Sequence, residues 1–257
     1  MFGWTKSNRR KKLVEQPVST QEFECLRDSL WQAEQLSLDD QSQLARWTRV
    51  FISEKHWEGC DGLTVTDDMK QAVASAAGVM VLRYPEWYFD HTTSIVMHRR
   101  PYIAKVNPKY QNTGMGGEYA RAGETIYRGP VVLNWQDIAR ASKHHHHGHH
   151  LIMHEFAHQL DMINGPRADG LPPLPNEVNE QAWRDAMHAE YEVARSMVAE
   201  GHQILMDDYG LTEEGEFFAV ASELYFQTPN ELAKYHPNVF ELLKQFYKID
   251  LRVQEDL

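Results

Sequence analysis

The chain is poor in cysteine and has no long apolar segment. Its 257 residues include two cysteines, Cys25 and Cys60, and these do not form a Cys-x-x-Cys pair. Such sparse usage is typical of unpaired thiols in a reducing compartment. No apolar run approaches the roughly 18 residues that a bilayer span requires, and residues 1–20 lack the apolar stretch of a secretory signal. We therefore expect a cytoplasmic protein with no membrane partner.

The chain also has fewer basic than acidic residues. Lys and Arg number 26 against 37 Asp and Glu, which gives a formal net charge of −11 with His neutral. Because contacts to phosphate depend on Lys and Arg, this balance disfavours nucleic acid as a direct partner. The one basic cluster, Arg9-Arg10-Lys11-Lys12, lies near the amino terminus. We interpret residues 1–20 as a flexible, solvated segment.

The order of the sequence patterns predicts an α+β fold that is mainly helical. Residues 20–57 and 66–80 have apolar residues at helical spacing, and helical patterns return from residue 149 to the end. Between them lie short β-rich segments at 93–97, 102–106 and 130–135. A small antiparallel or mixed sheet is therefore expected between two helical regions.

The segment LIMHEFAHQLDMINGP, residues 151–166, contains the strongest chemical signal. His154 and His158 are four residues apart, so a helix places them on one face, where both can bind one ion. Glu155 can reach a water on that ion. The alternative is a buried helix with two hydrogen-bonded histidines. An apolar stripe on the rest of the helix and a Gly-Pro stop support the helix itself: Met153, Phe156, Ala157, Leu160, Ile163, Gly165 and Pro166.

Catalytic zinc usually has three protein ligands and an open position for water. No third histidine follows His158 at short spacing, so we look to the later helix around residues 212–223. Glu223 lies among apolar residues, where a carboxylate is costly to bury without a cation, and we predict it as the third ligand. Glu216, two turns earlier on the same helix face, is the alternative third ligand. We expect it instead to cap the helix or to hydrogen-bond to a metal ligand. Asp161 could accept a hydrogen bond from a ligand histidine or form a surface ion pair.

These residues predict hydrolysis of amide bonds. Zinc would lower the pKa of a bound water from about 15.7 towards 7 and polarise the scissile carbonyl. Glu155 is the expected general base. Tyr209 and Tyr225 are candidates for stabilising the oxyanion, although packing is the alternative for each. The strand at 130–134 could pair with an extended peptide.

The segments HEFAHQLD and EFFAVASE together resemble the Mlc titration factor A family of bacterial zinc peptidases, which is distantly similar to the catalytic domain of anthrax lethal factor. The resemblance implies a zincin-like (gluzincin) metallopeptidase domain over residues 21–257, in one body or as two lobes that flank the active-site cleft. It implies one zinc held by His154, His158 and Glu223, with Glu155 as catalytic base. It further implies aminopeptidase-type activity on peptide or protein substrates, and binding of the repressor Mlc with an effect on glucose phosphotransferase uptake.

Two other functions stay open. The chain could be a regulator that sequesters a transcriptional repressor, with a latent or secondary zinc site. It could also be a histidine-rich metal carrier, because six of the seven residues from His144 to His150 are histidine. That run could load metal, or it could be an exposed loop that binds metal adventitiously. A carrier would not explain Glu155 or the second helix.

Overall fold

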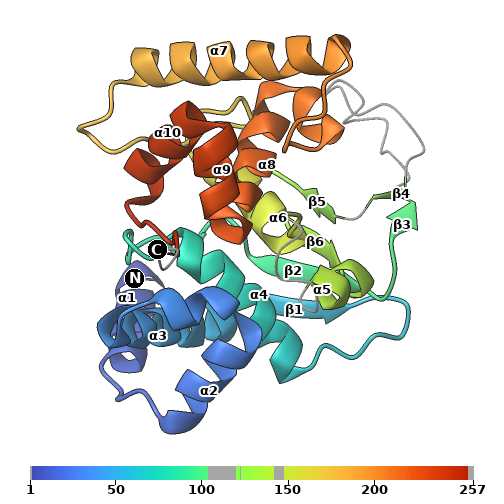
Figure 1. Ribbon diagram of the computed structural model, residues 1–257. Coiled ribbons are helices and arrows are strands. Elements are labelled where there is room, and N and C mark those ends of the chain that lie inside the picture. Colours follow the sequence, from blue (N-terminus) through green and yellow to red (C-terminus); the bar gives the residue numbers. More distant parts are fainter. Residues whose placement is uncertain (1, 104–119, 122, 142–147, 254–257) are drawn as a thin grey trace.

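Helices dominate the architecture and enclose a small sheet (Figure 1). The computed structural model describes residues 2–103, 120–121, 123–141 and 148–253. The amino-terminal helices gather at one end of the molecule and α7–α10 at the other, with the sheet and α6 between them (Figure 1). The amino-terminal helices are α1 (Phe2–Val14), α2 (Thr20–Ser29), the 3-10 helix η1 (Trp31–Gln35), α3 (Leu38–Glu54) and α4 (Asp67–Met80). The later helices are α5 (Trp135–Ala141), α6 (Leu151–Asp161), α7 (Glu180–Ala199), the 3-10 helix η3 (Asp208–Leu211), α8 (Glu214–Gln227), α9 (Pro229–Tyr235) and α10 (Pro237–Tyr247).

The helix starts follow local capping chemistry. The side chain of Thr66 accepts a hydrogen bond from the amide of Met69 at the start of α4, as the sequence pattern predicts. Ser37 caps α3 in the same way. Ser19 and Glu22 form a reciprocal capping box at α2.

The first residues differ from the flexible segment expected over 1–20, because residues 2–14 form helix α1. Arg10 of this helix donates to the nearly buried carboxylate of Glu54, at 2.7 Å, and to Asp90. Arg49 of α3 donates to the carbonyl oxygens of Leu13 and Pro17. Arg10 of the basic cluster therefore has acidic partners that are distant in sequence, and these contacts hold α1 against α3.

The main sheet is mixed and has the strand order β1-β2-β6-β5. Strands β1 (His56–Gly59), β2 (Ser94–His98) and β6 (Val131–Asn134) are parallel, and β5 (Gly123–Thr125) pairs with β6 in the antiparallel sense. Ile95 of β2 is in register with Trp57 on one side and Val131 on the other. Strand β6 is therefore an inner strand, which contradicts the idea that residues 130–134 offer a free edge. The outer strand on that side is β5.

A second, two-stranded antiparallel sheet pairs β3 (Tyr102–Ile103) with β4 (Ala120–Arg121). The expected strand at 102–106 is confirmed over its first two residues, and the rest lies outside the described residues. The same holds for residues 142–147, which include the first four histidines of the His-rich run.

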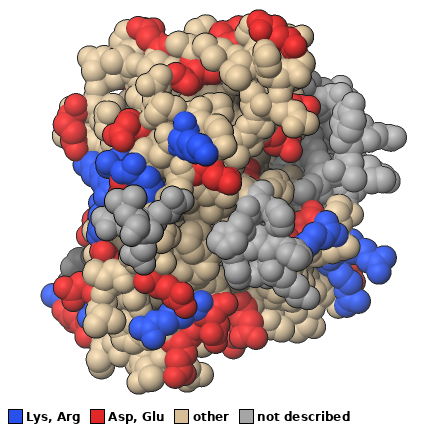
Figure 2. Space-filling model, in the orientation of Figure 1, with Lys and Arg blue, Asp and Glu red and all other residues tan. Residues whose placement is uncertain are grey.

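Acidic side chains are spread over the visible face, and Lys and Arg form separate small groups (Figure 2). The acidic residues on this face are thus dispersed rather than gathered in one patch. Within the part of the chain that the structure describes, no helix combines the length and the apolar character needed to cross a membrane.

Candidate metal centre

Helix α6 places two imidazole rings side by side in the interior. All eleven of its residues are buried, and it packs against α8, α4 and β5. His154 and His158 lie one turn apart, as predicted, and their Nε2 atoms are 3.2 Å apart. Their rings meet edge to face, with centroids 4.8 Å apart. The pair is therefore a buried, preformed arrangement with both Nε2 atoms facing one point.

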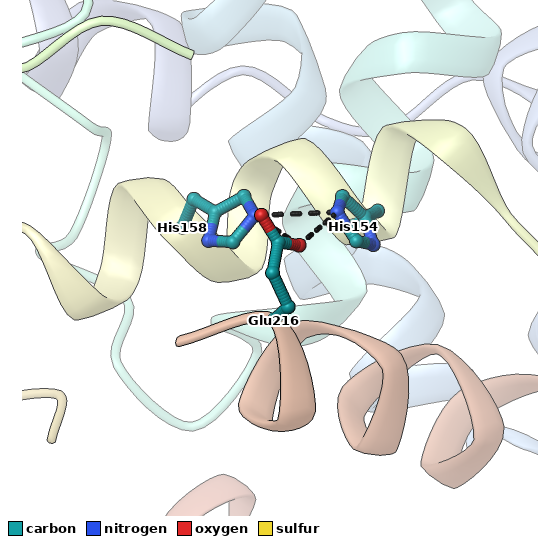
Figure 3. Close-up of side chains that lie close together, drawn as sticks. All are labelled: His154, His158 and Glu216. Carbon is teal, nitrogen blue, oxygen red and sulfur yellow. Dashed lines mark hydrogen bonds and ion pairs between the residues drawn. The ribbon is translucent and has the colours of Figure 1, made fainter. Parts of the chain in front are cut away.

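Glu216 of α8 completes this arrangement (Figure 3). One of its carboxylate oxygens, Oε2, lies 3.0 Å from Nε2 of His154 and 3.2 Å from Nε2 of His158. Its burial depends on close backbone packing, since a Cβ on the neighbouring Gly215 would lie 2.4 Å from the carbonyl oxygen of Ala168. The loop that contains Ala168 therefore packs against α8 at Gly215, next to Glu216.

The three donor atoms lie slightly closer together than the corners of one face of a zinc coordination tetrahedron. Zinc holds nitrogen and oxygen ligands at about 2.0–2.2 Å, so two ligands of a tetrahedral ion lie about 3.3–3.6 Å apart. The three observed separations are 3.0, 3.2 and 3.2 Å. A two-histidine, one-glutamate set suits zinc and leaves a fourth position for water. These residues fit a metal ion.

The predicted third ligand, Glu223, lies on the other side of His154. Its Oε1 is 2.7 Å from Nδ1 of that ring, whereas Glu216 contacts Nε2. The structure thus differs from the sequence prediction at the third position, where it brings Glu216, not Glu223, to both histidines. The physical reason is that two glutamates seven residues apart share a helix face, and the placement of α8 along α6 decides which one reaches the pair.

Burial and ion pairing shift the pKa values of this cluster in opposite directions. Burial is the largest single effect on Glu223 and opposes its ionisation, but the charge of His154 and the hydrogen bonds from His149 and His154 together lower the pKa of this carboxyl to about 2. Burial likewise opposes ionisation of Glu216, and its hydrogen bonds to the two histidines hold its pKa well below the usual range. Burial also lowers the pKa of the His154 imidazole, but the Glu223 charge and the hydrogen bonds to Glu216 and Glu223 together raise this pKa well above its ordinary value. In the absence of metal, the charges of these buried groups compensate one another.

Glu155 is buried beside the outer strand β5. A Cβ on Gly123 would lie 2.4 Å from Oε1 of Glu155, so a side chain at this position would displace the carboxylate from its present place. The hydroxyl of Thr125 donates to the backbone carbonyl of Glu155 at 3.1 Å. Burial raises the pKa of the Glu155 carboxyl, which suits a group that must accept and later release a proton near neutral pH. The role of Gly123 was not evident from the sequence.

The two candidate tyrosines are in different environments. Tyr209, in η3, is about half exposed, and its hydroxyl donates to Oε1 of Glu216 at 3.0 Å. Its ring centroid is 5.9 Å from that of His154. Tyr225 is fully buried and donates to the backbone carbonyl of Ile249. Tyr209 therefore lies beside the cluster of His154, His158 and Glu216, whereas Tyr225 packs in the core.

Asp161 is fully buried and organises the loop after α6. Its Oδ2 accepts a hydrogen bond from the amide of Gly170 at 2.8 Å. Burial raises the pKa of its carboxyl to about 7. No hydrogen bond to Nδ1 of His158 is found among the described residues. Asp161 thus holds the loop that packs against Gly215, and it does not form the surface ion pair considered from the sequence.

A buried helix that presents two histidines and an adjacent glutamate, with a carboxylate from a second helix, defines a metallopeptidase. Comparison with known proteins agrees. The chain belongs to the family described as glucose-regulated metallo-peptidase M90, whose model matches residues 4–248.

Relatives with similar sequences cover most of the chain. A protein named Mlc titration factor A from Edwardsiella ictaluri is 33% identical over 220 residues, which is 82% of this chain and 81% of that protein. The protein of the same name from Serratia proteamaculans is 31% identical over 217 residues, 82% of this chain and 80% of that one. An uncharacterised protein from Synechocystis is 28% identical over 249 residues, 94% of this chain and 88% of that one. The predicted resemblance to the Mlc titration factor A family is confirmed, and the distant similarity to anthrax lethal factor stays a prediction.

Proposed function

We propose that the protein is a zinc-dependent peptidase whose ion is held by His154, His158 and Glu216. The observation that carries this proposal is the mutual approach of three buried donor atoms to within 3.2 Å. Glu155 follows the first histidine directly and has no part in this ligand set, which leaves its carboxylate free for chemistry. A site that only stabilised the fold would need no such base.

Glu155 performs the proton transfers in the proposed reaction. When bound, zinc supplies a water of lowered pKa and polarises the scissile carbonyl. The Glu155 carboxylate accepts a proton from that water and then donates it to the departing amine, so that the amide is hydrolysed to a carboxylic acid and an amine. The raised pKa of Glu155 supports the second transfer, because the carboxyl holds the proton long enough to pass it on.

Tyr209 and β5 are proposed to orient the substrate. The Tyr209 hydroxyl lies within hydrogen-bonding distance of Glu216 and could turn towards the oxyanion, where a single donor is typically worth about 3 kcal/mol. Strand β5 is the outer strand nearest Glu155 and could pair with an extended peptide. This role replaces the one first assigned to residues 130–134.

The aminopeptidase type and a cytoplasmic location are also proposals. The first is supported by the resemblance of HEFAHQLD and EFFAVASE to that family, and the second by two cysteines that are both unpaired.

Metal removal tests the proposed function. Chelation should abolish hydrolysis of aminoacyl anilides, and about one equivalent of zinc per chain should restore it. Stoichiometry is read after a mild chelator wash, because the His-rich run can bind further metal loosely. A matched substrate with an acetylated amino terminus should stay intact if the enzyme is an aminopeptidase. Full activity in metal-free protein would contradict the proposal.

A second candidate function is binding of the repressor Mlc, which the name of two relatives suggests. We propose that this binding uses the surface, since a protein interface buries about 1,200–2,000 Å² and Glu155 is buried in the interior. Glu155→Gln should therefore bind purified Mlc with the parent affinity in calorimetry while its peptidase activity is lost. A large loss of affinity in folded, zinc-loaded mutant would place the repressor in the active site.

A further inference from the structure

The second buried glutamate of α8, Glu223, contacts one side chain of α6 and two groups of the segment that leads into α6. Its Oε1 lies 2.7 Å from Nδ1 of His154. Its Oε2 accepts a hydrogen bond from the backbone amide of His150 at 2.5 Å and lies 2.9 Å from Nδ1 of His149. The carboxylate is 1% exposed, whereas the His149 side chain is 63% exposed. Glu223 therefore connects an interior ring to a surface ring.

The contact with His154 fixes which nitrogen of that ring is free. In the neutral form of the ring, which is the form that binds metal, a hydrogen bond from Nδ1–H to a carboxylate leaves the lone pair on Nε2, the nitrogen that faces Glu216 and His158. It also fixes the ring plane and makes the free nitrogen more basic. His158 differs, because its buried Nδ1 has no hydrogen-bond partner among the described residues. Of the two rings, His154 is the one oriented by a carboxylate.

The other contacts of Glu223 hold the end of the His-rich run against α8. His150 caps α6, with its side chain accepting from the amide of Met153. Gly148 has a φ of +68°, and a Cβ there would lie 2.7 Å from Leu224, the neighbour of Glu223. The chain from Gly148 to His150 is thus placed by backbone geometry as well as by the carboxylate.

We propose that Glu223 is a positioning residue for the metal ligand His154. His149 contacts the second carboxylate oxygen of Glu223 and so helps to hold that carboxylate in place. This inference rests on the proposed zinc site. It gives the described end of the His-rich run a function in metal binding that does not require the run to hold an ion of its own.

Zinc affinity, measured by competition with a chromogenic chelator, tests the proposal. Glu223→Gln should still bind one zinc per chain but about 10–100-fold more weakly. Its cobalt-substituted form should keep the absorption intensity of a four-coordinate site, because no ligand is lost. In peptide hydrolysis the value of kcat should fall while KM stays near that of the parent.

Two further variants make the test specific. Glu214→Gln, on the exposed start of α8 where Glu214 pairs with His188 at 2.7 Å, should behave like the parent. His149→Ala removes an exposed ring, so the fold should persist, and zinc affinity should fall several-fold. If Glu223→Gln does not fold, His149→Ala decides the question, and parent-like affinity in that variant would overturn the proposal.

Other outcomes would also overturn it. Parent-like zinc affinity and kcat in folded Glu223→Gln would show that the carboxylate does not position the His154 ring. Complete loss of zinc from Glu223→Gln, with zinc retained by Glu216→Gln, would make Glu223 the ligand and leave the zinc peptidase itself intact. Failure of the parent protein to bind zinc would instead refute the proposed function.

Discussion

Replacing Glu155 by glutamine should leave zinc bound and lower kcat by about 10²–10⁴-fold, the range expected when general acid–base catalysis is lost. Glutamine has nearly the same size as glutamate, so it fits the space between α6 and Gly123. It cannot accept a proton from water at neutral pH. Because burial raises the pKa of the native carboxyl, its replacement by a neutral amide should not cost stability in the folded state.

The measurement is steady-state hydrolysis of a peptide substrate, with bound zinc and the melting temperature determined on the same sample. Glu214→Gln, a surface change of the same chemical kind, is the control and should retain parent activity. Unchanged turnover in a Glu155→Gln preparation freed of contaminating peptidases would refute the role given to this residue.

Replacing Glu216 by glutamine should remove tight zinc binding and, with it, activity. The change takes away the negative ligand that lies within 3.2 Å of both imidazoles, and a neutral amide is a poor ligand for zinc. Loss of a hydrogen bond to a metal-binding side chain typically lowers metal affinity about 10–100-fold. Loss of the metal-binding side chain itself should therefore lower zinc affinity more than about 100-fold. Chelator competition and restoration of activity by added zinc measure the effect.

The comparison between the two glutamates of α8 is the control for this prediction. Glu216→Gln should lose zinc, whereas Glu223→Gln should bind it more weakly. If Glu216→Gln retained parent affinity, the ligand set inferred from the geometry would be wrong.

Features that depend on neighbouring residues could be predicted from the sequence. The spacing of His154 and His158 implies a shared helix face, and in the structure their Nε2 atoms lie 3.2 Å apart because one helical turn fixes their separation. The cap at Thr66 and the strand near 93–97 are likewise local features, and both are present. The order of helical and β-rich segments was enough to predict the α+β class.

Features that depend on packing between distant segments could not be predicted. The choice between Glu216 and Glu223 depends on how α8 lies against α6, and the close approach of Gly215 to Ala168 helps set that placement. The pairing of Arg10 with Glu54, 44 residues away, converts an apparently flexible end into a docked helix. Hydrophobic pattern and capping signals contain no information about either contact.

The most direct test of the account is the position of zinc in crystals of the zinc-loaded protein, located by anomalous scattering at the zinc absorption edge. We expect one strong peak about 2.0–2.2 Å from Nε2 of His154, Nε2 of His158 and a carboxylate oxygen of Glu216, with Glu223 still on Nδ1 of His154. A peak coordinated by Glu223, or no peak between the two histidines, would contradict the account.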